Sequence, residues 1–405
     1  MAGPAPVGAA APAASVDATA DAPLRRAMAE GGGSRADARS APAEGEVRPY
    51  AARSAGPTRK ARRIADLLAE RPLFWRPRLT QLLRAATDDD LASLSVAQRA
   101  KAVTALQEGP TVEAEERAIA RVFLASAGAD LTALKNRVDA GDHNDMVQLI
   151  HDDIDEADIR ASLLAHFAAQ AGPRPGPENK VLSDIDDTLK ASINDKRYPK
   201  GTVYPGVRQL YLELDLGGAG AGRVGDLGFL TARPEIEGLA EDLWTRQTLK
   251  DAGLGHVTIL SGDLAHAFDH DAMAEKKAEN FRAYHGVFPE YGVVFIGDSG
   301  QGDEAAGRAM LAGAPDHVRG VFIHDLDGTK PKDAGGDVIF FDTYVGAAVQ
   351  AHARGLISDQ GLARVAAVAL QEQEAVPFKT DAQREHAQAL LQADLAKAAA
   401  ALGEH

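Results

Sequence analysis

The segment KVLSDIDDTLK, residues 180–190, joins a short apolar run to a group of carboxylates. The apolar run predicts a buried strand, and Asp184 and Asp186 follow at its end. Residues two apart in an extended strand point to the same side, so the spacing predicts that both carboxylates emerge together. Ligands of open α/β sheets bind beyond the carboxyl ends of the strands. This segment therefore predicts a strand and, next to it, a functional site.

The chain on either side of the carboxylates alternates between strand-like and helix-like patterns. Short apolar runs predict further strands at 227–231, 256–260, 291–298, 318–324 and 338–341. Between them, apolar residues spaced three and four apart predict helices, for example at 207–214, 237–249 and 275–284. Such alternation is typical of an α/β domain, a three-layer sandwich in which helices cover both faces of a mostly parallel sheet. We assign this domain to residues 173–354.

Three other segments flank the α/β domain. Residues 59–172 carry helical spacing throughout and predict an all-α domain, in which Thr87 caps a helix that begins with three Asp residues. Residues 1–58 are rich in Ala, Pro and Gly and have too few large apolar side chains to offset the entropy of ordering, so we expect a disordered tail. Residues 355–405 predict C-terminal helices. The Pro/Gly-rich stretch 171–180 marks the boundary before the α/β domain.

Composition narrows the function classes. The chain has 405 residues, a formal net charge of −15 and no cysteine. Its acidity argues against a nucleic-acid partner, because phosphate backbones are held mainly by Lys and Arg. Disulfides, thiolate metal sites and cysteine nucleophiles are excluded. No stretch approaches the ~20 apolar residues of a membrane-spanning helix, and the N-terminus lacks the basic and apolar regions of an export signal. We expect a cytoplasmic protein.

The strand-end carboxylates suit phosphoryl chemistry. Asp184 can attack phosphorus without first losing a proton, and Asp186 can pass a proton to the leaving oxygen. Two carboxylates would repel a phosphate, so a divalent cation is required, and Mg²⁺ suits hard oxygen ligands. Asp298 ends the run 291–298 and is the expected third carboxylate, while Asp303 either binds the ion or holds one of its waters. The expected metal residues are thus Asp184, Asp186 (through its carbonyl), Asp298 and Asp303.

A hydroxyl and an ammonium complete the expected catalytic set. Thr231 ends the run 227–231, where its hydroxyl can bind a phosphoryl oxygen. Lys277 opens a predicted helix and offers a compact positive charge to the transferring group and to Asp184. Lys276 is an equally charged neighbour, and the apolar Phe281 four residues after Lys277 favours Lys277. Further expected substrate-binding residues are Thr188, Lys190 and Arg233.

These motifs resemble those of the haloacid dehalogenase (HAD) superfamily. That superfamily combines a DxDxT motif, a strand-ending Ser or Thr, a Lys and an acidic GDxxxxD-like motif, and here DIDDT, FLT, Lys277 and GDSGQGD occur in the same order. The resemblance implies a Rossmannoid three-layer fold and a Mg²⁺-dependent phosphohydrolase. It also implies Asp184 as nucleophile, Asp186 as acid/base, Thr231 and Lys277 as phosphate binders, and Asp298 as metal ligand.

One branch of the superfamily is more similar still. SDIDDTLK at 183–190 and GDSG at 297–300 look like the catalytic domain of the App1-type phosphatidate phosphatases. This resemblance covers about 181–350 and implies phosphatidate or a related phospholipid as substrate. The second motif departs from that branch, since it reads TARP at 231–234 where the eukaryotic members carry a Ser-Asn-Ser-Pro type of segment.

Spacing adds two expectations about access to the site. The first and second motifs, like the second and third, are separated by little more than a βα crossover. We therefore expect a capless, open site, which suits bulky or interfacial substrates. The loop 190–201 carries Lys190, Lys196, Arg197 and Lys200, and we interpret it as a local positive potential beside the nucleophile. The alternative is an ordinary solvated loop.

Other readings stay open. Asp325 begins a second DxDGT sequence that is better explained as a turn, and the Asp- and His-containing segment 142–155 is better explained by helix caps than by a metal. The basic, apolar stretch 59–76 packs helices together or makes a peripheral contact with an anionic membrane. The rival to an enzyme is an interaction or delivered effector protein, in which the helical domain binds an unknown partner and the α/β domain is a scaffold or has a non-lipid substrate.

Overall fold

The computed structural model describes residues 56–139, 145–192, 194–216, 227–234, 249, 258–262, 270–300, 302–332 and 336–403. At a few of these positions, including Thr231 and Arg233, only the backbone is described. All but the last three residues of the predicted disordered tail lie outside the described residues, and so does nearly all of the helix predicted at 237–249.

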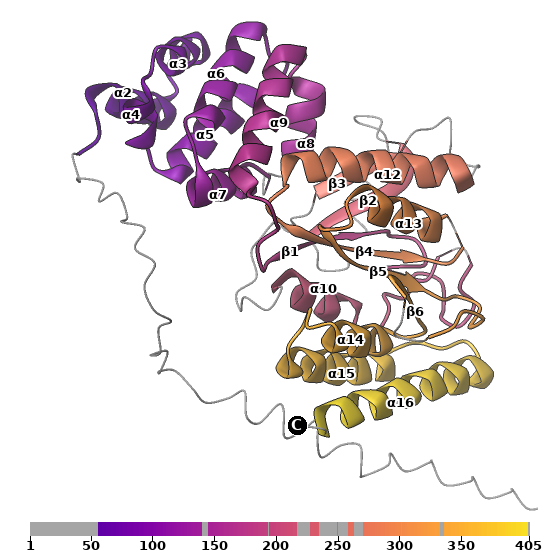
Figure 1. Ribbon diagram of the computed structural model, residues 1–405. Helices are drawn as coiled ribbons and strands as arrows, with labels where there is room; N and C mark the ends of the chain where they lie inside the picture. The colour runs from indigo at the N-terminus through magenta and orange to yellow at the C-terminus, as the bar shows by residue number, and fades with distance from the viewer. Residues whose placement is uncertain are drawn as a thin grey trace, which may run out of the picture.

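One sheet of six parallel strands forms the centre of the α/β domain (Figure 1). The strands are β1 (Asn179–Ser183), β2 (Leu227–Pro234), β3 (Thr258–Gly262), β4 (Gly292–Asp298), β5 (Val318–His324) and β6 (Val338–Phe341). Their order is β3-β2-β1-β4-β5-β6, and every neighbouring pair is parallel. The predicted α/β class with a parallel sheet is confirmed. The strand order reverses between β1 and β4, and in such sheets the ligand crevice lies at the reversal.

Side chains alternate across the sheet and contribute to two cores. Leu182 of β1 and Phe295 of β4 belong to one core, whereas their neighbours Val181 and Ile296 belong to the other. The first core lies beneath α12 (His270–Val287) and α13 (Asp303–Gly313). The second lies beneath α10 (Val207–Leu216), α14 (Tyr344–Ala353), α15 (Asp359–Glu374) and α16 (Asp381–Gly403). Figure 1 shows the two helical layers on opposite sides of the strands, as the alternation of buried residues requires.

The N-terminal region is helical. It consists of α2 (Arg59–Glu70), α3 (Trp75–Arg84), α4 (Asp88–Ala92), α5 (Val96–Gln107), α6 (Glu113–Leu124), α7 (Gly128–Asp139), α8 (Met146–Gln148), a π-helix (Leu149–Asp153) and α9 (Ala157–Ala171). The Thr87 side chain accepts a hydrogen bond from the backbone N–H of Asp90, and the Asp90 side chain accepts one from Thr87. This reciprocal cap confirms the helix start predicted at Thr87.

The helical region and the sheet share one buried core. Lys135 of α7 donates a 2.7 Å hydrogen bond to Glu290, which lies between α12 and β4. Lys180 of β1 is fully buried, lies 4.0 Å from Asp139 of α7 and places its ammonium 4.1 Å from the centre of the Phe288 ring. Buried charges are tolerated only when they are paired, so these contacts make the two regions one packed unit.

The surface of the helical region has an apolar tip and mixed charge. Leu73 and Phe74 are 83% and 77% exposed, whereas Trp75 packs against the core and has the Arg71 guanidinium 4.8 Å above its ring. Helix packing therefore accounts for Trp75 but not for Phe74.

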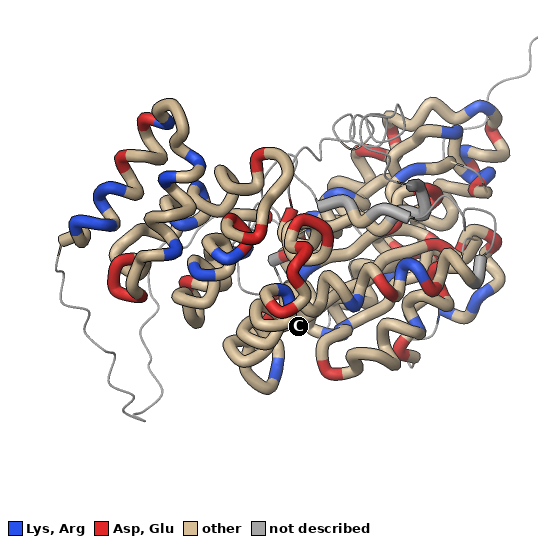
Figure 2. Tube along the Cα trace, turned by 90° about the horizontal axis from the view of Figure 1, so that it is seen from above, with Lys and Arg blue, Asp and Glu red and all other residues tan. Residues whose placement is uncertain are grey.

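Figure 2 shows Lys and Arg interspersed with Asp and Glu along both regions. Within the described part of the chain, no helix is long and apolar enough to cross a membrane.

Candidate functional site

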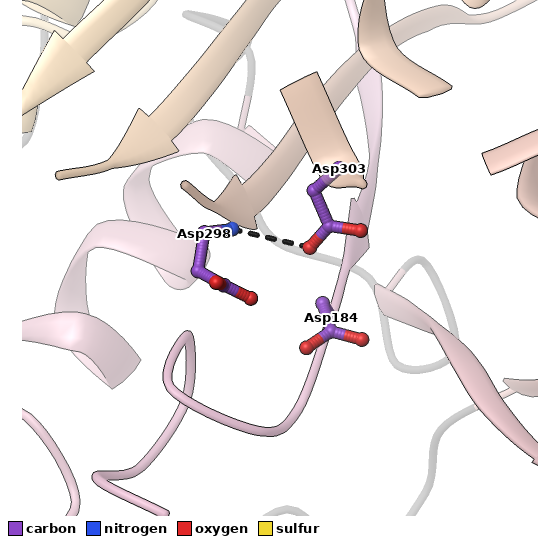
Figure 3. A group of neighbouring side chains, drawn as sticks. All are labelled: Asp184, Asp298 and Asp303. Carbon is purple, nitrogen blue, oxygen red and sulfur yellow. Dashed lines mark hydrogen bonds between the residues drawn. The ribbon is translucent and has the colours of Figure 1, made fainter. Parts of the chain in front are cut away.

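Two carboxylates at adjacent strand ends and a third at the start of a helix meet where the strand order reverses. Asp184 follows β1, Asp298 ends β4 and Asp303 begins α13. One oxygen of each lies within 4.8 Å of the others, and all three side chains are buried. Figure 3 shows the three carboxylates facing one common space. The parallel pairing of β1 with β4 causes this meeting, because it places the carboxyl ends of both strands at the same edge.

A glycine in β4 allows Asp303 to approach the strand. Asp303 Oδ2 accepts a 3.1 Å hydrogen bond from the backbone N–H of Asp298. A Cβ atom on Gly297 would lie only 2.5 Å from the Cβ of Asp303, so a side chain at position 297 would displace it. The Gly-Asp pair in GDSGQGD thus has a steric reason. The other oxygen of Asp303 accepts a hydrogen bond from Lys277. Because both oxygens are already bonded, the structure favours a supporting role for Asp303 over direct binding of the ion.

Lys277 lies between the carboxylates. Its ammonium donates to Asp184 Oδ1 at 2.8 Å and to Asp303 Oδ1, and the side chain is 2% exposed. Lys276 points instead to solvent, where it pairs with Glu279 at 3.4 Å. Phe281, four residues after Lys277, is buried in the core. The structure therefore places Lys277, and not Lys276, at the candidate site.

The electrostatics of the site leave a deficit of positive charge. Burial, together with the nearby charges of Asp303 and Asp186, raises the pKa of Asp184 to about 7, although Lys277 opposes the rise. Burial, together with Asp303 and Asp184, also raises the pKa of Asp298 well above its usual value. Burial lowers the pKa of Lys277, but the adjacent carboxylates outweigh it and raise that pKa above its ordinary value. One ammonium does not balance three carboxylates, so the site favours binding protons or a cation.

Two of the carboxylate oxygens have no hydrogen-bond donor among the described residues. They are Asp184 Oδ2 and Asp298 Oδ2, and both are inaccessible to solvent. A buried acceptor without a partner is costly and calls for an explanation. A hard divalent cation between the two oxygens would satisfy both of them and offset the negative charge. The donor set, which consists only of carboxylate oxygens, fits Mg²⁺ better than a softer metal.

Asp186 and Thr188 lie on the loop that follows Asp184. Asp186 is buried, and its charge is one of the causes that raise the pKa of Asp184. The Thr188 hydroxyl is buried and has no hydrogen-bond partner among the described residues, whereas the Thr188 carbonyl accepts from the Tyr344 hydroxyl. Both residues of the first motif are therefore buried on the loop that begins at Asp184.

The remaining expected substrate-binding residues are placed less fully. Lys190 is partly buried and its backbone pairs with Asp186 and Val203. Thr231 and Arg233 belong to β2, the strand next to β1, but their side chains are not described. The expected roles of these two residues therefore stay predictions.

Arg197 corrects the interpretation of the basic loop. Its guanidinium is buried and forms a two-point ion pair with Asp195, with N–O distances of 3.0 and 2.9 Å. It also lies 2.8 Å from Nε2 of His324 and donates to the backbone carbonyl of Asp325. Arg197 therefore stabilises the loop from inside and contributes no solvent-facing charge. Sequence reasoning missed this network, although the opposite charges two residues apart were a signal.

The two alternative acidic segments do not join the site. Asp325 is buried after β5, where its carboxylate accepts from the backbone N–H of Lys330 at 2.7 Å and pairs with Lys332. Asp145 caps α8 by accepting from the N–H of Gln148, while 141–144 lie outside the described residues. Among the residues that are described, Asp184, Asp298 and Asp303 form the one group of acidic, His or Cys side chains able to share a metal ion.

Comparisons with known proteins add no family to this geometry. A scan against protein-family models, a search of curated proteins and a search of solved structures each found no match.

Proposed function

We propose that this protein is a Mg²⁺-dependent phosphomonoesterase of the HAD type that acts through an aspartyl-phosphate intermediate on Asp184. The observation that supports it most is the meeting of Asp184 with Asp298 and Lys277 at the reversal of the strand order. The ordered occurrence of the four HAD-like motifs in the sequence supports it independently. A nucleophilic carboxylate, an ammonium and a cation-binding pair are the groups that phosphoryl transfer needs in one place.

The cation would be held by the carboxylates of Asp184 and Asp298 and by the carbonyl of Asp186, with Asp303 as support. When bound, Mg²⁺ supplies positive charge against a phosphoryl group and against the carboxylates that would otherwise repel it. Lys277 keeps Asp184 ionised and oriented through its 2.8 Å hydrogen bond. The raised pKa of Asp184 makes this help necessary, because only the carboxylate form is a nucleophile.

The proposed reaction has two displacements at phosphorus. In the first, a carboxylate oxygen of Asp184 forms a bond to phosphorus, the ester P–O bond breaks, and Asp186 gives its proton to the leaving oxygen. In the second, Asp186 accepts a proton from a water molecule whose oxygen attacks the same phosphorus. The bond between Asp184 and phosphorus then breaks, which releases phosphate and restores both carboxyl groups.

The proposed substrate class is a phosphomonoester, with phosphatidate or a related phospholipid as the specific candidate. The candidate rests on the similarity of SDIDDTLK and GDSG to the phosphatidate phosphatase branch. The spacing of the motifs supports an open, capless site that a bulky lipid headgroup can approach. The departure at TARP, residues 231–234, makes the lipid the part of this proposal that most needs an assay.

A phosphate-release assay tests the proposal. The full-length protein is given p-nitrophenyl phosphate, and separately phosphatidate in detergent micelles, with Mg²⁺ or with EDTA. We expect Mg²⁺-dependent release that falls at least ~10³-fold in Asp184→Asn, because the nucleophile is lost. Lys276→Met is the matched control and retains activity. Activity that survives Asp184→Asn contradicts the mechanism, and a wild-type protein inactive on both substrates favours the interaction or effector alternative.

A further inference from the structure

The loop that follows the first motif is held rigid by Asp187. Asp187 has a positive φ of 58°, a conformation that a non-glycine residue keeps only when its surroundings stabilise it. Its carboxylate accepts hydrogen bonds from the backbone N–H groups of Ser192 and Asn194, both at 2.7 Å, and of Asp195 at 3.3 Å. The backbone at Ser192, Asn194 and Asp195 is thereby tied to one side chain of the first motif.

A second set of bonds fixes the far end of the loop. The Asp195 carboxylate is bound by Arg197 and also accepts from the Tyr204 hydroxyl at 2.8 Å. Nδ1 of His324 lies 2.9 Å from the carbonyl of Asp187, and Nε2 lies 2.8 Å from the Arg197 guanidinium. Burial lowers the pKa of His324 to about 4, so the neutral ring donates from Nδ1 and accepts at Nε2. The network ties the loop to the end of β5.

The loop places the exposed side-chain amide of Asn194 near Asp298, a candidate metal ligand. The side chain of Asn194 is exposed and has no hydrogen-bond partner among the described residues. Its Nδ2 atom lies 2.9 Å from the point where a Cβ of Gly300 would stand, and Asp298 Oδ1 lies 3.0 Å from that same point. The absence of a side chain at Gly300 leaves the space that the Asn194 amide faces.

We propose that Asn194 is a substrate-binding residue whose side-chain N–H groups donate to an oxygen of the phosphoryl group. This inference rests on the proposed phosphomonoesterase function and names a residue outside the four HAD-like motifs. The carboxylates already repel an anionic substrate, and Lys277 is engaged by Asp184 and Asp303. A neutral donor on a loop held by several hydrogen bonds binds an anion at a lower ordering cost, because its backbone is preorganised.

The test measures binding rather than turnover. Full-length wild type, Asn194→Ala and Asn194→Asp are titrated with Mg²⁺ alone, and then with inorganic phosphate at saturating Mg²⁺, by calorimetry. Loss of a hydrogen bond to a charged group predicts phosphate binding about 10-fold weaker in Asn194→Ala. Asn194→Asp keeps the shape but removes the donor and adds a negative charge, so we expect at least ~100-fold weaker phosphate binding. Mg²⁺ affinity of Asn194→Ala stays within about twofold of wild type, because Asn194 is not assigned to the ion.

Lys276→Met is the matched control, because Lys276 points to solvent and pairs with Glu279 instead of with the carboxylates of the site. We expect it to bind phosphate within about twofold of wild type, since an exposed charge is screened by salt. Phosphate binding by Asn194→Asp equal to wild type, or an equal loss in Asn194→Ala and Lys276→Met, overturns the assignment. If wild type binds Mg²⁺ but no phosphate, the proposed phosphomonoesterase function fails together with the assignment of Asn194. If wild type binds phosphate and Asn194→Asp binds it equally well, only the assignment of Asn194 fails. Thermal melting of each variant checks that it is folded.

Discussion

Nζ of Lys277 lies 2.8 Å from Oδ1 of Asp184, although 93 residues separate the two in the chain. One is on α12, which covers the sheet, and the other follows β1. The contact is possible because Phe281 and its neighbours bury that helix against the sheet. The position of the ammonium therefore depends on the same apolar packing that stabilises the domain.

Replacing Lys277 by Met tests the role that the proposed function gives to its ammonium. We expect phosphate release to fall by about 10²–10³-fold, because a preorganised charge near the transferring group is lost. Mg²⁺ affinity does not fall, since removal of a positive charge leaves the carboxylates more attractive to a cation. Lys276→Met changes either quantity less than about twofold, as expected for an exposed side chain. A parallel loss of activity and of Mg²⁺ binding in Lys277→Met would indicate general collapse of the site instead.

Mg²⁺ binding is expected to depend on pH. The pKa of Asp184 is raised to about 7 and that of Asp298 is raised as well. Below pH 7 the proton occupies the position that the metal needs, and above it the carboxylate is free. For one such group, affinity rises about 10-fold from pH 6 to pH 8, with release of a proton. Calorimetric titrations in buffers of different ionisation enthalpy measure the Mg²⁺ affinity and the number of protons released. Equal affinities at pH 6 and pH 8 contradict the prediction.

Gly297→Ala is expected to disturb the site through sterics alone. The added Cβ would lie 2.5 Å from the Cβ and 2.6 Å from Oδ2 of Asp303. Overpacking of this kind costs about 1–3 kcal/mol of unfolding free energy, and displacement of Asp303 should also weaken Mg²⁺ binding. Gly313→Ala in α13 is the control, because nothing lies within 4 Å of its added Cβ. Urea unfolding of both variants measures the difference. Equal unfolding free energies of the two variants would show that Asp303 can shift without destabilising the protein.

His324 predicts a loss of stability in acid. Burial and the nearby Arg197 lower its pKa to about 4, whereas an unfolded histidine titrates near about 6.5. Above pH 6.5 the His324 ring is neutral in both the folded and the unfolded protein, and its full contribution to the unfolding free energy is present. As the pH falls toward 4, this contribution is lost, because only the unfolded protein gains a proton there. The loss from this residue is about 2 kcal/mol by pH 5. Urea unfolding at pH 7 and pH 5 measures it, and His324→Gln should show a smaller difference between the two pH values.

The sequence was sufficient to predict the sheet and the meeting of its strand-end carboxylates. Each predicted strand is short, apolar and separated from the next by helical spacing, which left a parallel sheet as the simple solution. Once β1 and β4 are parallel neighbours, Asp184 and Asp298 must lie at one edge. The choice of Lys277 followed from the apolar period of its helix, because only one of two adjacent lysines can face the sheet.

The loop network could not be predicted in the same way. Arg197 resembles Lys196 and Lys200 in composition, but its partner His324 lies 127 residues away, beyond any local pattern. Asn194 is equally inconspicuous, because its place beside Asp298 depends on the turn at Asp187 and on the missing side chain of Gly300. Irregular loops are fixed by many weak, specific contacts rather than by a period, so sequence spacing carries little information about them.

The burial of Lys180 in β1 bears on how the chain can be divided. An α/β piece without α7 would leave this ammonium with no Asp139 to face, and water would enter between β1 and the rings around it. Cutting the chain at the Pro/Gly-rich joint between α9 and β1 should thus yield two poorly soluble pieces that regain structure when co-expressed. The joint is a suitable place for a split-protein reporter, and an unsuitable one for trimming the protein to a minimal domain.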